Sequence, residues 1–504
     1  MAFLDSPDRT FTLAGRGGTG KTTIVKKVIE RAVREQLSVG GGAVSHAAKE
    51  VLGESIGQKR VHTVASLLAI KLNEGTGNFE PDEWARQRGA VPVRDFDLLV
   101  IDETSMISEE MMQEILREAK PDAKIIFMGD NVQLPPIGDG DEDSPTFLVS
   151  KARNYAVLTD RVRQGEDSPI VVLSDVLARN IEGEGLLRAL SLEDRKTKYD
   201  PEADAGVIFS ADEDEVVRML VVDLKKDPGN PRGSKAVVFN NERYTRSSQS
   251  VLNLNKTIRK QLYGERAENQ FNIGEIVVCY AQWSPKKGSQ PVVHNAISYV
   301  VDAVSMSYQK AVRARWQGNK LNETYSVVDL TISDHTGRPV TVPVVAQSDA
   351  ARYQRDLGDR NKAPGALYFR LSEAFANIQY GYAITSHKAQ GSTYRNVYVF
   401  EDNILGMSNR SAPLTKNKSL YVAVTRPSHK LVMHSEENTD PGSLKGILQA
   451  GVVKGAEPKG DGPPVLRDLK FADSLSTAQN ELLRALRADG LLKLASEIPL
   501  PEES

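Results

Sequence analysis

The chain has 504 residues, which is more than one hydrophobic core usually holds, so we expect three or four domains. Its net charge of −3 argues against a protein that coats nucleic acid electrostatically, but leaves room for a local basic channel. One cysteine, Cys279, excludes an intramolecular disulfide and a cysteine zinc site, which permits a cytoplasmic location, and no stretch approaches the ~20 apolar residues of a membrane helix.

Short apolar runs and helical patterns alternate over the first 150 residues, which is typical of βαβ units on a parallel sheet. We expect strands at 10–14, up to 44, at 97–101 and at 123–128, and helices at 21–36, 46–52 and 109–119. The polar segment 73–94 interrupts this pattern and contains Phe79 and Trp84, so we expect a small inserted hairpin there.

The remaining chain divides by composition. A second set of α/β signals predicts a strand at 236–239 and a helix at 245–261, and β-branched alternation at 325–331 and 339–345 indicates an inserted small β-barrel. We therefore expect domains at 1–150, at 151–280 together with 371–435, and at 281–370. Residues 436–504 are expected to be a linker with one or two amphipathic helices at 466–494.

A phosphate-binding loop is predicted at 15–22, where GRGGTGKT matches G-x-x-x-x-G-K-[ST] between an expected strand and an expected helix. Its backbone N–H groups and the helix dipole suit the phosphates of ATP, Lys21 suits the β- and γ-oxygens, and the Thr22 hydroxyl suits Mg²⁺. The expected nucleotide-binding residues are Gly15, Gly17, Gly18, Thr19, Gly20, Lys21, Thr22 and Thr23. The alternative is a chance glycine-rich turn, which both flanks argue against.

Two further segments follow apolar strands and carry catalytic candidates. Asp102 and Glu103 end the strand DLLVI, where Asp102 would hold Mg²⁺ through water and Glu103 would polarise the attacking water. Gln133, in GDNVQLPP, could bond the γ-phosphate or that water. Its alternative is a proline-stiffened surface turn.

Seven segments occur in one order: GRGGTGKTT (15–23), AVSHAAKEVL (43–52), VHTVASLL (61–68), LLVIDETSM (98–106), IIFMGDNVQLPPIG (125–138), AITSHKAQGSTYRNVYVF (383–400) and LYVAVTRPSHK (420–430). Together they resemble superfamily 1 helicases, most of all the 5′→3′ branch that contains RecD and the phage Dda helicase. The likeness extends to 241–260 and 271–278 and covers about 10–435. It implies an α/β fold with two RecA-like parallel-sheet P-loop domains, an inserted hairpin and an inserted SH3-like β-barrel.

The resemblance also implies roles for arginines and for a glycine. Arg426, in VAVTRP, resembles the arginine finger of the second domain, and Arg163, in LTDRVRQ, resembles a second arginine that reaches the γ-phosphate. The alternative for Arg163 is an ordinary surface arginine. Gly391 lies in the segment that the family uses to couple the nucleotide to the strand. No glutamine precedes Gly15, where the family places its adenine-reading segment.

Contacts to the nucleic acid follow from the same resemblance. The implied residues are Ser45, His46, His62, Thr63, Phe79, Ser386, His387 and Lys388. Hydroxyls and imidazoles bond phosphates transiently, which suits stepping, and an aromatic residue on the hairpin could stack on a base. The alternatives are a structural role for His387 and simple packing of Phe79 and Trp84 against their domain.

The sequence thus predicts an ATP-dependent DNA helicase that moves on single-stranded DNA, 5′→3′ by family likeness, and acts on forked or tailed duplexes with ATP and Mg²⁺. We expect a monomer in the cytoplasm, or in the host cytoplasm for a phage-encoded protein. Residues 436–504 could bind a replication protein or pack on the chain's own surface. Alternative functions are a translocase that mainly displaces bound proteins and a nucleotide switch that does not unwind.

Overall fold

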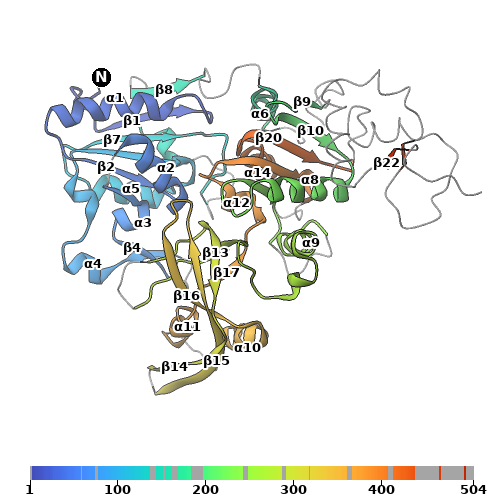
Figure 1. Cartoon of the computed structure of the whole chain (residues 1–504). Coiled ribbons are helices and arrows are strands. Elements are labelled where there is room, and N and C mark those ends of the chain that lie inside the picture. The colour runs from blue at the N-terminus through green and yellow to red at the C-terminus, as the bar shows by residue number, and fades with distance from the viewer. Residues whose placement is uncertain are drawn as a thin grey trace, which may run out of the picture.

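The structure is a computed structural model, and it describes residues 3–57, 60–73, 78–136, 144–150, 154–159, 168–182, 197–241, 248–286, 291–316, 318–359, 366–406, 413–436, 465–466 and 493–494. Three six-stranded sheets organise this part of the chain. The first and second sheets lie side by side, and the third projects from the junction between them (Figure 1). No helix in the described ranges is long and apolar enough to cross a membrane.

The first sheet is fully parallel, in the order β3-β2-β6-β7-β1-β8. Its strands are β1 (Thr10–Gly15), β2 (Val39–Ala43), β3 (Val61–Thr63), β6 (Leu98–Asp102), β7 (Lys124–Gly129) and β8 (Tyr155–Leu158). Its helices are α1 (Lys21–Arg34), α2 (His46–Ile56), α3 (Val64–Leu67), α4 (Glu83–Gln87) and α5 (Glu109–Glu118), with the 3₁₀ turns η1 (Pro92–Asp95), η2 (Thr104–Met106) and η3 (Pro145–Phe147). Parallel strands end at one edge, where open α/β sheets bind ligands.

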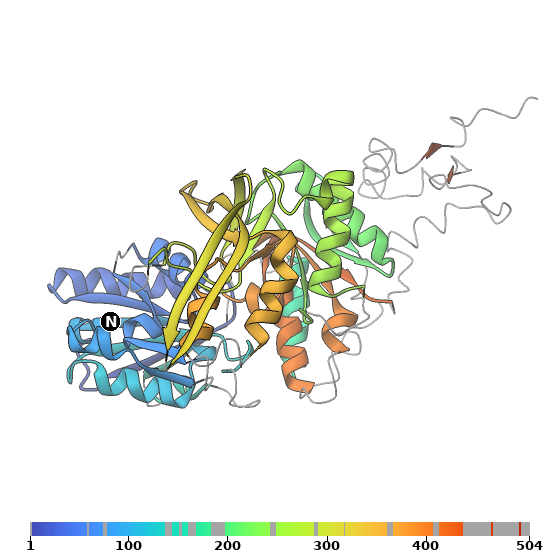
Figure 2. The ribbon, with the colours of Figure 1, turned by 90° about the horizontal axis from the view of Figure 1, so that it is seen from below.

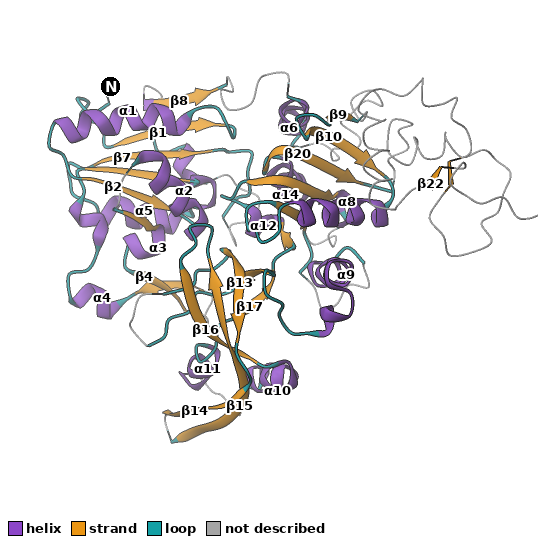
Figure 3. Cartoon of the chain, viewed as in Figure 1, coloured by secondary structure: helices purple, strands orange, loops and turns teal. Residues whose placement is uncertain are grey.

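The second sheet has the order β18-β11-β19-β20-β10-β9 and is parallel except for β9. Its strands are β9 (Lys198–Asp200), β10 (Ala205–Ser210), β11 (Ser234–Val238), β18 (Ala383–Thr385), β19 (Tyr394–Phe400) and β20 (Pro427–His434). Its helices are α6 (Pro169–Arg179), α8 (Glu213–Lys226), α9 (Val251–Tyr263), α12 (Ser386–Ala389), α13 (Glu401–Leu405) and α14 (Pro413–Val424), with η5 (Gly264–Glu268). Figure 3 shows these helices around the strands.

The third sheet is antiparallel, in the order β14-β15-β13-β12-β17, with β16 also paired to β15. Its strands are β12 (Ile276–Cys279), β13 (Ser298–Val304), β14 (Tyr308–Trp316), β15 (Asn319–Ser333), β16 (Pro339–Val345) and β17 (Ile378–Tyr380). Helices α10 (Gln347–Gly358) and α11 (Ala366–Ser372) accompany it. In the chain, this sheet separates the two halves of the second sheet.

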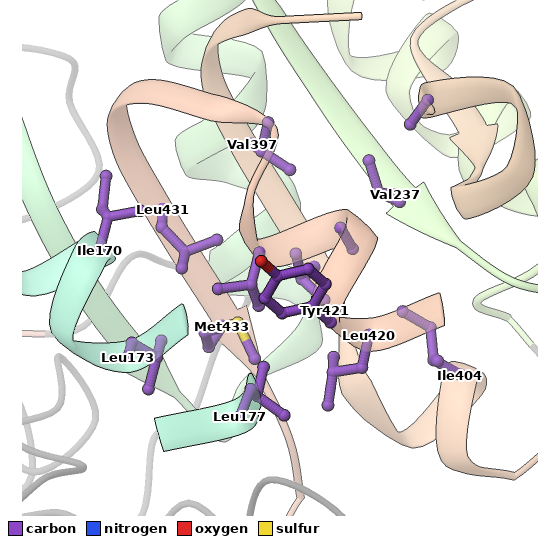
Figure 4. Close-up of a cluster of buried hydrophobic side chains, with 14 of the residues drawn as sticks. Ile170, Leu173, Leu177, Val237, Val397, Ile404, Leu420, Tyr421, Leu431 and Met433 are labelled. Atoms are coloured by element: carbon purple, nitrogen blue, oxygen red, sulfur yellow. The ribbon is translucent and has the colours of Figure 1, made fainter. Parts of the chain in front are cut away.

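Buried apolar side chains hold each sheet to its helices. In the second domain one cluster joins α6 and α14 to the strands, and Tyr421 lies among Leu173, Leu420 and Met433 at its centre (Figure 4). In the first domain the strand β2 reads VGGGA because its neighbours need the space: a Cβ at Gly40 would overlap the Phe96 ring. Close packing of this kind tolerates no extra methyl group.

Several expected element boundaries were wrong. The helix expected at 245–261 begins at Val251, because the Ser250 hydroxyl caps it by accepting a hydrogen bond from Asn253 N at 3.2 Å. A two-stranded antiparallel ladder of β4 (Ile70–Asn73) and β5 (Asn78–Pro81) occurs near the hairpin expected at 73–94, but it begins three residues earlier and ends at Pro81. Trp84 lies in the helix α4 after it, since Asp82 caps that helix. Most of 466–494 lies outside the described residues, and its ends form the short paired strands β21 (Val465–Leu466) and β22 (Lys493–Leu494).

A buried lysine in β11 makes stability depend on pH. Lys235 is fully buried, and its ammonium donates to the Gly381 carbonyl oxygen, while burial lowers its pKa from 10.5 to about 7. Between pH 7 and pH 10.5, Lys235 is therefore protonated more in the unfolded chain than in the folded one. The free energy of unfolding rises with pH across this range. We expect Lys235→Met to abolish that rise and to stabilise the protein at pH 7 by about 1 to 3 kcal/mol. Urea unfolding at pH 7 and pH 10 measures it, with the exposed Lys225→Met as control.

Candidate functional site

The phosphate loop joins the end of β1 to the start of α1. Gly18 and Gly20 adopt left-handed φ values of 80° and 82°, and Gly20 stands at the N-cap of α1 without a side-chain cap. The first N–H groups of a helix have no partner within the helix, so these donors face the loop. The Lys21 ammonium donates to the carbonyl oxygens of Gly15 at 2.5 Å and Arg16 at 3.0 Å, which holds its charge over the same loop. This set of donors suits a phosphate group.

Gly15 is required by the close approach of two chain segments. A Cβ there would lie 2.8 Å from Thr19 Oγ1 and 2.9 Å from the Leu158 carbonyl oxygen, so a larger residue would push the loop away from β8. Thr19 is buried, and its hydroxyl donates to the Arg16 carbonyl oxygen at 2.8 Å. The loop is therefore fixed by its own backbone and by the neighbouring strand.

Asp102 and Glu103, the acid pair, follow β6. This strand lies two strands from β1, which leads into the phosphate loop, because β7 separates them. Burial raises the pKa of Asp102 well above its ordinary range, the neighbouring Glu103 raises it further, and Lys21 lowers it. A divalent cation beside Asp102 would oppose this rise, so the carboxyl suits a Mg²⁺ site. Glu103 has left-handed backbone angles of φ 53° and ψ 43°, which is uncommon for a non-glycine residue and is typical of functional positions.

Gln133 follows β7 and lies at the seam between the first and second domains. It is buried, and its Oε1 accepts a hydrogen bond from Gln390 Nε2 at 3.3 Å. Gln390 Nε2 also lies 3.4 Å from Ser105 Oγ, two residues after the acid pair. The sequence motif that follows β18 is thus in contact with both segments that flank the predicted nucleotide.

Further contacts close the seam on both sides. The Tyr421 hydroxyl of α14 donates to Asp130 Oδ2 at 2.7 Å, and both residues are buried. Arg16, in the phosphate loop, pairs with Asp175 of α6 at 2.5 Å. The first-domain segments that hold the phosphate loop and Gln133 are therefore both bonded directly to the second domain. Tyr421 was not predicted, although it lies in the LYVAVTR segment.

Arg426 is held within the second domain. It is 6% exposed, and its guanidinium donates to the carbonyl oxygens of Val422 at 3.0 Å and Ser392 at 3.1 Å. The neighbouring Gly391 has a φ of 76° and packs against α2: a Cβ there would lie 3.0 Å from Ala48 Cβ. The loop bonded to Arg426 therefore touches the first domain. Arg163 lies outside the described residues.

The residues of the first domain that were expected to contact the nucleic acid lie at the N-terminal ends of α2 and α3. Ser45 caps α2 by accepting from Ala48 N at 3.1 Å, and Thr63 caps α3 by accepting from Ser66 N at 3.2 Å. The His46 ring stacks on that of His294, with centroids 4.0 Å apart, and burial lowers the pKa of His46 to about 4. His62 is half-buried, and burial lowers its pKa as well. Phe79 lies in β5, and its side chain is outside the described structure.

The candidates of the second domain follow β18. Ser386 is fully buried, and His387 packs against the Phe239 ring with centroids 5.7 Å apart. The Lys388 ammonium lies 4.0 Å from the centre of the Tyr280 ring and donates to Asn295 Oδ1 at 3.2 Å. His294 and Asn295 therefore contact one strand-contact segment from each domain. No sequence signal marked them, because they lie in an irregular stretch between strands.

Comparisons with known proteins agree with this architecture. Residues 1–194 match the AAA domain family, and 380–434 match the UvrD-like helicase C-terminal domain family. The ATP-dependent DNA helicase dda of Enterobacteria phage T4 is 25% identical over 444 residues, which span 82% of this chain and 92% of that protein. The ATP-dependent RecD2 DNA helicase of Deinococcus radiodurans is 32% identical over 163 residues, 32% of this chain and 21% of that protein. These similarities support a RecD/Dda-like helicase of superfamily 1.

The prediction of a superfamily 1 helicase from seven ordered segments is therefore confirmed. The predicted α/β class with a parallel-sheet P-loop domain is confirmed too, by the six parallel strands around β1. Among solved structures, Bacteroides Pif1 bound to single-stranded DNA shares 17% identity and a TM-score of 0.44, with 88% of this chain and 94% of that chain covered.

The stacked imidazoles predict a pH-sensitive contact in this helicase. Burial lowers the pKa of His46 from 6.5 to about 4 and also lowers the pKa of His294, so below pH 6.5 the separated rings bind protons more readily than the packed rings do. The contact between α2 and the third sheet is therefore complete above pH 6.5 and weakens as the pH falls toward 4. We expect hydrogen exchange of α2, corrected for its intrinsic rate, to speed up at pH 5, and to do so less in His46→Phe.

Proposed function

We propose that this chain is an ATP-dependent DNA helicase that moves 5′→3′ on single-stranded DNA and unwinds forked or tailed duplexes. The observation that carries this proposal is the bond between Gln133 and Gln390, because it joins a residue beside the predicted nucleotide to the second domain. A change at the phosphates would thus alter the fit of the two domains. Motion between domains is what converts hydrolysis into stepping.

We assign ATP with Mg²⁺ to the loop between β1 and α1. Lys21 and the loop N–H groups would hold the phosphates, and Thr22 and Asp102 would hold the metal, which supplies charge neutralisation at the phosphates. Glu103 would accept a proton from the attacking water, while its backbone N–H donates a hydrogen bond to Asp102 Oδ1 at 2.8 Å. Gly15, Gly17, Gly18, Thr19, Gly20 and Thr23 complete the pocket.

We assign charge stabilisation of the γ-phosphate to Arg426 and Arg163. Arg426 bonds the Ser392 carbonyl oxygen, next to the Gly391 loop that touches α2, and we propose that closure of the two domains brings its guanidinium to the γ-phosphate. A guanidinium is always charged and can bridge two oxygens, which suits this role. The site would be complete only when the seam is closed.

We assign the single strand to Ser45, His46, His62, Thr63, His387 and Lys388, whereas Ser386 is fully buried and would support the segment from within. Gly391 would couple this path to the nucleotide, since its loop touches α2 directly after Ser45 and His46. We further propose that β4 and β5, with Phe79, form the pin that separates the strands, and that the third sheet is the inserted SH3-like barrel. The protein would act as a monomer in the cytoplasm, or in a host cytoplasm, and residues 436–504 could contact a replication protein.

Removal of the phosphate-loop cation tests the nucleotide site. We expect Lys21→Ala to reduce ATPase activity stimulated by single-stranded DNA by at least about 100-fold, because Arg16, the other cation of the loop, is paired with Asp175. The matched control is Lys26→Ala, an exposed lysine of the same helix, which should hydrolyse ATP as the wild type does. Surviving stimulation in Lys21→Ala would refute the assigned pocket.

Removal of the Gln390 amide tests whether the contact between the two domains couples strand binding to ATP hydrolysis. We expect Gln390→Ala to retain its affinity for single strands but to lose about 3- to 10-fold of the stimulated ATPase rate, the range of one or two hydrogen bonds. The exposed Gln379→Ala provides the control. An unchanged rate in Gln390→Ala would mean that the seam does not transmit the signal.

The polarity of movement is tested with tailed duplexes. Duplexes with only a 5′ tail should be unwound in the presence of ATP and Mg²⁺, whereas those with only a 3′ tail should remain paired. Displacement of a strand-bound protein without any unwinding would favour a translocase. No stimulation of the ATPase by single-stranded DNA would favour a nucleotide switch.

A further inference from the structure

A long hairpin of the third sheet reaches away from both RecA-like domains. Strands β14 and β15 form it, with Trp316 opposite Asn319 at its turn (Figure 1). The other end of β15 leads to His335, which contacts Glu54 of α2 at 3.3 Å. A strand advances ~3.4 Å per residue, so the fifteen residues of β15 place the hairpin turn roughly 45–50 Å from that contact. In the view from below, the long yellow strands of the third sheet lie across the front of the molecule (Figure 2).

One face of this hairpin is anchored, so the arm has a defined orientation. Val312, Leu321 and Tyr325 are buried, and they pack against α11 and Phe375 in a single apolar cluster. Tyr325 also donates to Asp356 of α10 at 2.6 Å. The arm is therefore a rigid ribbon, and its opposite face is determined by the strand alternation.

The opposite face carries cations and uncharged hydrogen-bonding groups, and no carboxylate. Its four cross-strand pairs are Gln309 with Ser326, Ala311 with Thr324, Arg313 with Asn322, and Arg315 with Lys320. We call this set the outer face. Arginine, lysine and small polar side chains of this kind are those that contact phosphate and sugar in protein–DNA complexes.

Two of the acids that contact this ribbon are engaged in ion pairs with one arginine. Glu323 and Asp349 both pair with Arg352, which lies over the Tyr325 ring on the anchored face. Arg313, Arg315 and Lys320 are exposed. Arg313 and Arg315 are two residues apart, about 6.8 Å, and Lys320 faces Arg315 across the ladder at about 5 Å. Three exposed cations thus lie near the turn of the arm, in a protein whose net charge is −3.

We propose that the outer face of the β14–β15 hairpin binds the phosphate backbone of duplex DNA ahead of the fork. The inference rests on the proposed helicase function. A two-stranded ribbon fits a duplex groove, and a duplex carries one charge per ~1.7 Å of its axis, twice the density of one strand. The distance from α2 to the hairpin turn corresponds to roughly 13 base-pair steps, so this contact lies well beyond the single-strand path.

Salt-dependent binding tests the proposal in the full-length protein. The variant combines Arg313→Gln, Arg315→Gln and Lys320→Gln, and the probes are a forked duplex and a single-stranded oligonucleotide of equal tail length. We expect affinity for the fork to fall at least about tenfold at 0.1 M salt, and the slope of log K against log salt to shrink by about 2 to 3. Affinity for the single strand and the ATPase that it stimulates should match the wild type.

A control with the same change of charge combines Lys26→Gln, Lys27→Gln and Arg34→Gln on the exposed face of α1, and it should bind the fork normally. Equal fork affinity and slope in the hairpin variant and the wild type would overturn the inference. Normal fork binding accompanied by self-association would instead assign the three cations to protection of the edge strand β14. If single-stranded DNA did not stimulate the ATPase of the wild-type protein, the proposed helicase function would be contradicted. This measurement does not involve the hairpin variant, so the two failures are distinguishable.

Discussion

Everything in the nucleotide site depends on the parallel alignment of three adjacent strands. Because β1, β7 and β6 run in the same direction, the phosphate loop, Gln133 and the acid pair leave the sheet at one edge. Because β7 lies between β1 and β6, the segment that carries Gln133 leaves the sheet between the phosphate loop and the acid pair. No long-range electrostatic steering is needed to gather these groups, since backbone hydrogen bonds of the sheet do so.

The seam converts this local arrangement into a property of the whole chain. Gln390, Tyr421 and Asp175 reach the first domain from three different elements of the second, and each bonds a residue within or beside the nucleotide site. The third sheet adds a separate link through His294 and Asn295. The ATP site and the strand path are therefore joined by short polar contacts. Each such hydrogen bond contributes only about 0.5–1.5 kcal/mol, so one can be replaced by another at little cost in free energy.

The sequence predicted the groups that follow strands and missed those that tertiary packing brings together. The phosphate loop and the acid pair were found because a strand, a glycine-rich turn and a helix are local signals. Tyr421, His294 and Asn295 were missed because their partners lie hundreds of residues away or in another sheet. The β4–β5 ladder was expected too late in the chain, at 73–94 and not at 70–81. Polar composition marks an irregular region but does not fix the register of short strands.

Buried polar atoms at the seam explain why this arrangement is suited to change. In the described part of the chain, Thr104 Oγ1, Ser386 Oγ and Gln390 Oε1 are buried without a hydrogen-bond partner. Each costs about 1 to 3 kcal/mol, and all three lie in segments that connect the nucleotide site to the second domain. A core that held these domains permanently would satisfy or remove such groups. Groups of this kind are available for other hydrogen bonds, which suits a motor that alternates between two closures of one seam.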